Sequence, residues 1–194
     1  MRNLSIAVIV AVLSITCSIQ LHAQRYLPVQ RGIQFSGGIT GDINKSLNKE
    51  SAFYFGSALA TYTKNGNRWV IGAEFLNKDY LYKDQIIPVS KFIGDGGYYF
   101  KLLSDRRKTF FLSFGVTASA GYETSNWGEK LLYDGATLKN KDAFIYGGSG
   151  ILELETYLSD RLVLLLNARE RVMFGSSIEK FQTQYGIGFK FIIN

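Results

Sequence analysis

The chain has 194 residues, which is enough for one domain with a full core or for one closed barrel. Twenty glycines, two prolines and 14% aromatic residues suit a β-rich fold. The formal net charge of +6 is a mild excess that does not indicate a nucleic-acid-binding protein. Length and charge therefore argue against a multidomain chain and against direct contact with nucleic acid.

The N-terminal residues differ in character from the rest of the chain. Arg2 gives a positive start, residues 4–19 are nearly all apolar, and Ala23 closes the stretch with a small residue. This order predicts a secretory signal peptide over residues 1–23, which leaves an outer-membrane β-barrel domain over residues 24–194.

Two alternatives for this segment remain open. Residues 4–21 are long enough for a membrane anchor, and Cys17 offers a site for lipid attachment, although the residues before it fit that pattern poorly. Cleavage after Ala23 would remove both Cys17 and His22, the only cysteine and histidine. Because one cation, Arg2, and no acid would be lost, the formal charge would fall from +6 to +5.

The rest of the chain repeats one pattern, in which apolar residues occupy every second position. Successive side chains of a strand point to opposite faces, so this period of two predicts strands with one apolar face and one small or polar face. The clearest example starts at Phe110 and ends at Tyr122. Eight such segments are predicted, at about residues 33–39, 53–63, 68–76, 89–102, 110–122, 143–158, 161–174 and 182–194.

Short and long connections alternate between these segments. The short ones are "KNGN", "SDRRK" and "SD", and the Asn65-Gly66 pair in the first favours a type I′ turn. Longer connections follow the first, third, fifth and seventh segments, and the longest covers residues 124–142. Short turns at one end and long loops at the other are the layout of an outer-membrane barrel.

The polar faces indicate which side of each strand is enclosed. They consist mostly of Gly, Ser, Thr and Ala with isolated charges, whereas a soluble barrel would need charges along every wetted strand. Small residues fit the interior of an eight-stranded barrel, and Phe, Leu and Tyr facing outward suit hydrocarbon. We therefore predict an all-β fold: a single eight-stranded antiparallel up-and-down transmembrane β-barrel after a cleaved signal peptide. A lipocalin-like soluble barrel, apolar inside, is the alternative.

Several charged residues fall on the predicted inner faces. Charges enclosed in a barrel must be paired, so we expect an internal charge network in which Glu153 and Glu155 lie beside the arginines of the next strand. The predicted members are Glu74, Asp95, Glu153, Glu155, Arg169 and Arg171.

No catalytic, cofactor or metal site is predicted. Outer-membrane barrel enzymes generally use a histidine as general base, and the predicted mature chain has none. Without His or Cys, an ordinary zinc site is not expected either. Candidate partner contacts in the longest loop are Trp127, Tyr133 and Asp134, although Trp127 and Tyr122 could instead belong to an interfacial aromatic girdle.

Long stretches of the chain resemble one known family. "ATYTKNGNRWVIGAEF", "GGYYFKLLSD", "GYETSNWGEKLLYDGATLKNKDAFIYGG", "YLSDRLVLLLNARERV" and "QYGIGFKFI" are similar to the TraO family of conjugative-transposon transfer proteins. The resemblance covers nearly all of the predicted mature chain. It brings no catalytic motif that maps onto particular residues here.

The resemblance implies a non-enzymatic component of a DNA-transfer apparatus in the outer membrane of a Gram-negative bacterium. Such a barrel would have both termini in the periplasm and act as a structural or docking part. Its partners would be other conjugation proteins and outer-membrane lipid, with no nucleic acid or small-molecule substrate bound directly. A free-standing surface-binding or adhesion barrel is the competing interpretation.

Overall fold

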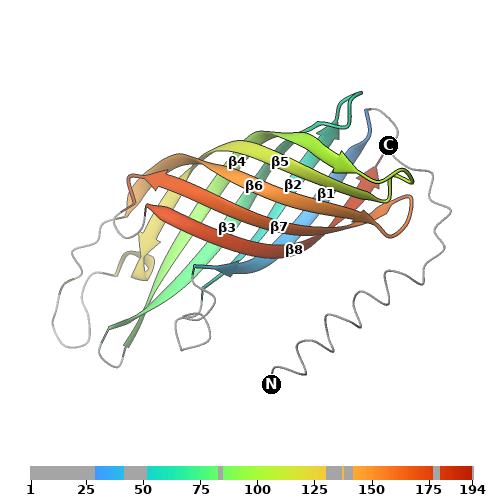
Figure 1. The fold of residues 1–194 in the computed structure, drawn as a ribbon. Coiled ribbons are helices and arrows are strands. Elements are labelled where there is room, and N and C mark those ends of the chain that lie inside the picture. Colours follow the sequence, from blue (N-terminus) through green and yellow to red (C-terminus); the bar gives the residue numbers. More distant parts are fainter. Residues whose placement is uncertain are drawn as a thin grey trace, which may run out of the picture.

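The computed structural model describes residues 29–41, 52–82, 85–129, 137, 142–176 and 180–193. The predicted signal peptide, with Cys17 and His22, lies outside them. Eight strands form one closed sheet, with a short 3₁₀ turn, η1, after the fifth strand (Figure 1). The elements are β1 Arg31–Thr40, β2 Ala52–Tyr62, β3 Arg68–Tyr82, β4 Gln85–Ser104, β5 Phe110–Ser125, η1 Asn126–Gly128, β6 Ala143–Tyr157, β7 Leu162–Phe174 and β8 Phe181–Ile193.

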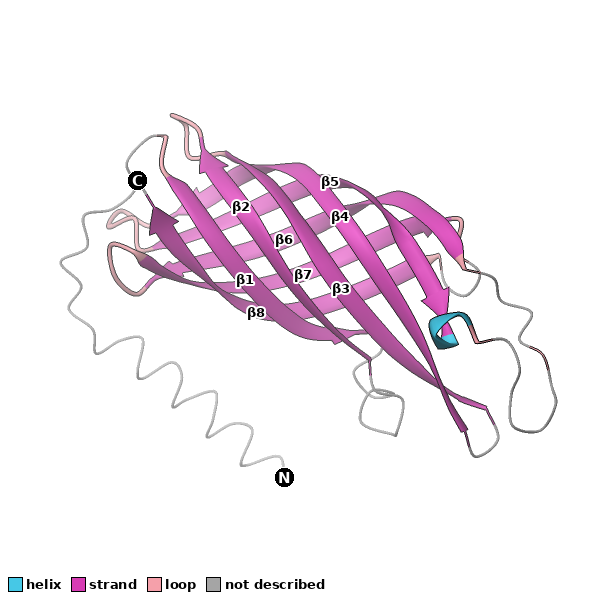
Figure 2. Ribbon diagram, turned by 180° about the vertical axis from the view of Figure 1, so that it is seen from behind, coloured by secondary structure: helices cyan, strands magenta, loops and turns pink. Residues whose placement is uncertain are grey.

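Every strand is antiparallel to both of its neighbours, and the strands follow the chain order around the barrel (Figure 2). Closure comes from β1 and β8, which pair from Arg31 opposite Ile193 to Thr40 opposite Gln184. The prediction of an eight-stranded antiparallel up-and-down barrel is confirmed.

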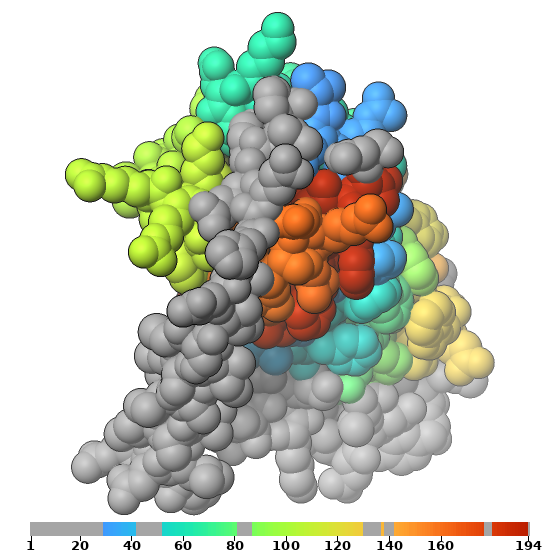
Figure 3. Space-filling view, turned by 90° about the vertical axis from the view of Figure 1, so that its right-hand side faces the viewer, coloured from blue at the N-terminus to red at the C-terminus, as the bar shows by residue number. Residues whose placement is uncertain are grey.

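Three short turns lie at one end of the barrel, which we call the turn end; the other is the loop end. They cover residues 63–67, 105–109 and 158–161. The start of β1 and the end of β8 lie at the same end, because Arg31 pairs with Ile193. Figure 3 looks onto the turn end, where the lime-green β4–β5 turn projects beyond the wall.

The β2–β3 turn is not the predicted type I′ turn. The N–H of Thr63 donates to the carbonyl of Asn67 over 2.7 Å, so residues 64–66 form a three-residue loop. Gly66 has a φ of 86°, in the left-handed region that glycine tolerates, whereas Asn65 does not have a positive φ. The chain therefore uses a three-residue hairpin with glycine in the left-handed position.

The predicted long loop between the third and fourth segments is in fact a hairpin. Ala52 of β2 pairs with Lys78, and Val89 pairs with Ser125 of β5, yet β3 and β4 continue pairing beyond these points. The extension is a two-stranded ribbon that projects beyond the other strands at the loop end, at the lower right of Figure 2. Apolar and polar residues alternate where a strand has lipid on one side and the lumen on the other. The ribbon lies beyond the barrel wall and has no such pair of environments, so the alternation did not predict it.

Apolar side chains cover the outside of the barrel. On β5, Phe114 and Val116 are 39% and 53% exposed, whereas Thr117 is 5% exposed. The same alternation continues on β8, where Phe189 is exposed and Lys190 is fully buried. The faces are therefore those predicted for a transmembrane barrel, and the lipocalin-like alternative is wrong.

The interior is filled by larger side chains than the sequence analysis expected. Beside small residues it contains aromatic and aliphatic groups, as in the cluster of Tyr62, Phe111, Tyr157, Val163, Leu165 and Ile192. Glycines make room for them: a Cβ on Gly186 would lie 1.8 Å from the hydroxyl oxygen of Tyr54. The lumen is thus a packed core, as eight strands require.

Candidate functional site: a charged interior and an apolar wall

Four charged residues meet in the middle of the lumen. Arg171 donates from Nη1 to Oε1 of Glu74 over 2.7 Å and from Nη2 to Oδ2 of Asp95 over 2.8 Å. Arg169 reaches the same two carboxylates over 2.9 and 3.3 Å. These residues, here called the central charge cluster, come from β3, β4 and β7, so the ion pairs span the lumen.

Neutral polar groups complete the central charge cluster. The Nε2 of Gln184 donates to Oε1 of Glu74 over 2.8 Å, and the Ser119 hydroxyl donates to Oδ1 of Asp95. Buried ion pairs repay the cost of desolvation only when their remaining hydrogen-bonding positions are also used. These contacts use further acceptor positions of the two carboxylates and hold them in place. Among the described residues, the Nε of Arg171 and the Oε1 of Gln184 are buried without a hydrogen-bond partner.

The sequence analysis expected Glu153 and Glu155 to pair with Arg169 and Arg171. In the structure they have other partners. Glu153 pairs with Arg68 over 2.6 Å, and Glu155 pairs with Arg68 over 3.2 Å and with Lys190. We call these four residues (Arg68, Glu153, Glu155 and Lys190) the turn-end charge cluster.

Strand register explains the difference. Arg169 lies opposite Ile151 and Arg171 lies opposite Ser149, so both arginines are displaced toward the loop end from Glu153. Arg68, the first residue of β3, is at the turn end and faces the glutamates across the lumen. Pairing across the lumen therefore replaces the pairing between adjacent strands that the sequence suggested.

A third pair lies nearer the loop end. Lys91 and Glu123 are 3.0 Å apart, and the Ser176 hydroxyl donates to the same carboxylate over 2.6 Å. Sequence reasoning left these two charges, together with Arg68 and Lys190, out of the predicted network. The inward position of Lys190 could have been predicted from the alternation, because a lysine between two outward phenylalanines must face inward.

Paired charges fill the lumen across its width. In the central and turn-end clusters every charged side chain has an oppositely charged partner among the described residues. A cavity of ≈ 30 Å³ borders Asp95 and Arg169, which is space for about one or two waters. Within the described residues, the strand-lined interior is filled by side chains, as is usual for eight strands.

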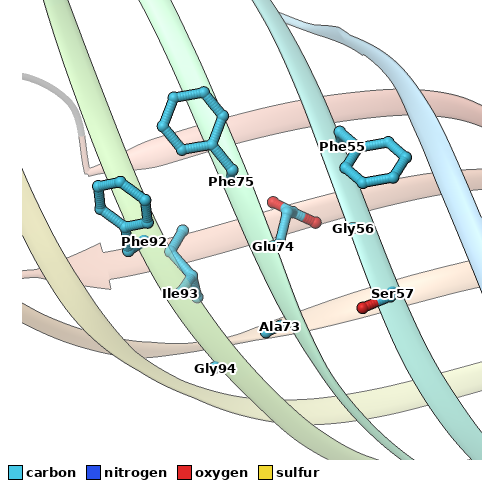
Figure 4. Close-up of a pocket in the computed structure, with 9 residues that line it drawn as sticks. All are labelled: Phe55, Gly56, Ser57, Ala73, Glu74, Phe75, Phe92, Ile93 and Gly94. Atoms are coloured by element: carbon cyan, nitrogen blue, oxygen red, sulfur yellow. The ribbon is translucent and has the colours of Figure 1, made fainter.

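The outer wall carries a shallow apolar groove over β2, β3 and β4 (Figure 4). It has a volume of ≈ 430 Å³. The rings of Phe55, Phe75 and Phe92 lie in one row across the three strands, beside a row of the small residues Ser57, Ala73 and Gly94.

The structure describes one of the three loop candidates. Trp127 is 63% exposed in η1, beyond the end of β5, and has a φ of 52°. Tyr133 and Asp134 lie outside the described residues. Tyr122 is an outward residue of β5 and is 48% exposed.

The described residues lack two features. No group of three His, Cys, Asp or Glu side chains there could hold a metal ion. In the same part of the chain, no helix is long and apolar enough to cross a membrane.

Fold, apolar wall and charged interior define a transmembrane β-barrel of the outer-membrane class. Solved barrels of this class share its fold. The N-terminal β-barrel domain of Pseudomonas aeruginosa OprF is 10% identical, with a TM-score of 0.50 over 86% of this chain and 98% of that one. Neisserial surface protein A is 10% identical, with a TM-score of 0.52 over 84% of this chain and 95% of that one. Ail of Yersinia pestis is 9% identical, with a TM-score of 0.54 over 86% of this chain and 100% of that one.

The chain belongs to the TraO family, described as "Conjugative transposon protein TraO", whose model matches residues 27–193. The resemblance seen in the sequence is thereby confirmed, and with it a role in conjugative transposon transfer. No curated protein matches the chain.

Proposed function

We propose that this protein is a non-enzymatic structural and docking component of a conjugative DNA-transfer apparatus in the outer membrane. Membership of the TraO family supports the assignment to conjugation. The observation that carries the docking role is the central charge cluster, in which Arg171 joins Glu74 and Asp95 across the lumen. A barrel filled in this way does not pass a DNA strand, so it serves transfer by bracing or binding other proteins.

The proposed orientation places both termini and the short turns in the periplasm, because outer-membrane barrels have short periplasmic turns and longer external loops. The turn end is also strongly basic, which suits binding of an acidic surface on another transfer protein. Its exposed cations are Arg31, Lys64, Lys101, Arg106, Arg107, Lys108 and Arg161, beside the acidic residues Asp105 and Asp160.

Deletion of the gene tests this function. We expect mating frequency to fall, and expect the wild-type chain supplied in trans to restore it. The same cells should yield other transfer proteins when the tagged barrel is purified from outer membranes. Unchanged mating frequency after deletion, with the barrel instead retaining an external ligand, would favour an adhesion barrel.

A further inference from the structure

One ionisable residue breaks the apolar outer wall. Glu170 of β7 is exposed and lies between Gly150 of β6 and Thr183 of β8 in the register. Its neighbours in sequence, Arg169 and Arg171, point into the lumen and belong to the central charge cluster. Alternation along the strand therefore turns Glu170 toward the membrane.

Glu170 lies inside the apolar band and not at its edge. Phe174, four residues further along β7, is 50% exposed near the loop end. Four residues of a tilted strand correspond to roughly 10 Å along the barrel axis. Phe181 is likewise exposed at the loop end of β8, two residues before Thr183.

The carboxylate stands in a notch in the wall. The notch has a volume of ≈ 280 Å³, and the small residues Gly150 and Ala168 give it its depth. Phe114, Leu152 and Tyr185 contribute larger side chains around it.

Within the described part of the chain, Glu170 has a hydrogen-bond donor but no cation. The Thr183 hydroxyl donates to its Oε2 over 2.6 Å. Both adjacent arginines are already paired with Glu74 and Asp95. An unpaired charge on the lipid face destabilises a barrel, and ionisable residues inside the membrane commonly mark a functional contact.

We propose that the Glu170 notch, lined by Phe114, Gly150, Leu152, Ala168, Thr183 and Tyr185, binds a membrane-spanning segment of another protein that presents a lysine or arginine at this depth. The proposal rests on the proposed function and specifies where the barrel meets its partner. A small-residue floor allows close approach, and the cation of the partner would neutralise the carboxylate away from water.

Charge argues against two other occupants. A second copy of this chain would bring no suitable cation, because the exposed lysines and arginines of the described residues lie in turns or near strand ends. A symmetric contact would instead set Glu170 against itself. Phosphate groups of membrane lipids carry the same sign as the carboxylate and would be repelled.

The test places a photo-crosslinking amino acid at Ala168 in the full chain, in cells that carry the whole transfer apparatus. Ala73, an exposed small residue of β3 on another part of the wall, is the matched control position. We expect Ala168, and not Ala73, to capture a membrane-spanning transfer protein. Glu170→Gln should reduce this product about tenfold or more, as should neutralising one lysine or arginine of the captured protein.

Folding and function are separated by further variants. Glu170→Gln should leave heat-resistant migration of the barrel unchanged. Ile187→Gln, which places the same amide on the exposed face of β8, should lower stability somewhat but leave the crosslink of the folded barrel unchanged. Exchanging the charges, with Glu170→Lys and an acid in the partner, should restore the product.

Three results would overturn the proposal: capture of lipid or of a second copy at Ala168, a crosslink insensitive to Glu170→Gln, or no crosslink at all. Loss of mating on gene deletion, with any of these results, would reject the notch and leave the proposed function intact. Normal mating after deletion would reject the proposed function itself.

Discussion

Arg171 on β7 joins Glu74 on β3 across the lumen, with 2.7 Å between Nη1 and Oε1, although these strands are not neighbours. Both side chains are almost completely buried. The pair ties opposite walls of the barrel together. The stability of the barrel and the blocking of its lumen therefore depend on the same few side chains.

Arg171→Ala should destabilise the barrel strongly. It leaves Glu74 and Asp95 with one arginine between them, and removing one partner of a buried ion pair costs about 3–5 kcal/mol. Urea unfolding of the refolded barrel in lipid vesicles measures the change. Lys101→Ala, at an exposed position, is the control and should be within about 0.5 kcal/mol of wild type. Equal stability of the two variants would contradict the structural role of the cluster.

The two faces of β5 should differ sharply in tolerance. Phe114→Arg should cost about 2–4 kcal/mol if the position lies near mid-bilayer. Thr117→Ser keeps the hydroxyl that lies 2.6 Å from that of Ser149, so it should be nearly neutral. The same vesicle assay compares them, and similar losses at both sites would be inconsistent with this assignment of faces.

Purified protein should show no stable large conductance in planar bilayers, because paired side chains close the lumen. Single-channel recording at moderate voltage measures this directly, with a porin of known conductance as the positive control. A steady wide-pore current from the monomer would place the protein in the porin class and remove the argument for docking.

Asp105 should make the β4–β5 turn sensitive to acid. Slight burial acts to raise the pKa of its carboxyl, but hydrogen bonds from the backbone N–H groups of Phe110, Thr109 and Arg107 outweigh this and lower the pKa. Since the folded pKa lies below the unfolded one, the stabilisation is complete above about pH 4 and is lost as the pH falls through the folded pKa.

Asp105→Asn tests this. The variant should be less stable than wild type at neutral pH by about 1 kcal/mol or less, because water screens this only partly buried site. The difference should shrink in acid, where wild type loses the same interaction. Comparing the two at each pH cancels the titration of the interior acids. A difference that stays constant from neutral pH to strong acid would argue against the carboxylate as the cause.

Trp127→Ala should impair transfer without weakening the barrel. The side chain is exposed and lies beyond the last residue of β5, so it adds little to the wall. Mating frequency and urea unfolding are measured on the same variant, with Tyr122→Ala as the comparison within the wall. Loss of stability at Trp127 would instead support a place in the aromatic girdle.

Much of the wall could be predicted from sequence because each strand faces two unlike environments. Phe114 and Thr117 fall on opposite faces by alternation alone, and β8 shows the same rule at Lys190. Interior pairing could not be predicted in the same way. The contact of Arg68 with Glu153 depends on the stagger of strands far apart in the chain, which no local pattern records.

The notch was missed for a different reason. Glu170 occupies an outward position on β7, and a single acidic residue on an outward face has no distinctive pattern in the sequence. Its significance comes from neighbours on β6 and β8, Gly150 and Thr183, which only the register brings beside it.

The lumen charges also favour one register of β7 over its neighbours. A slip of β7 by one residue would turn Arg169 and Arg171 out into lipid and bring Glu170 inside, reversing every face of the strand at once. A slipped β7 would therefore lose the ion pairs of the central charge cluster. The ion pairs that close the lumen in the mature barrel thus also specify the register of β7.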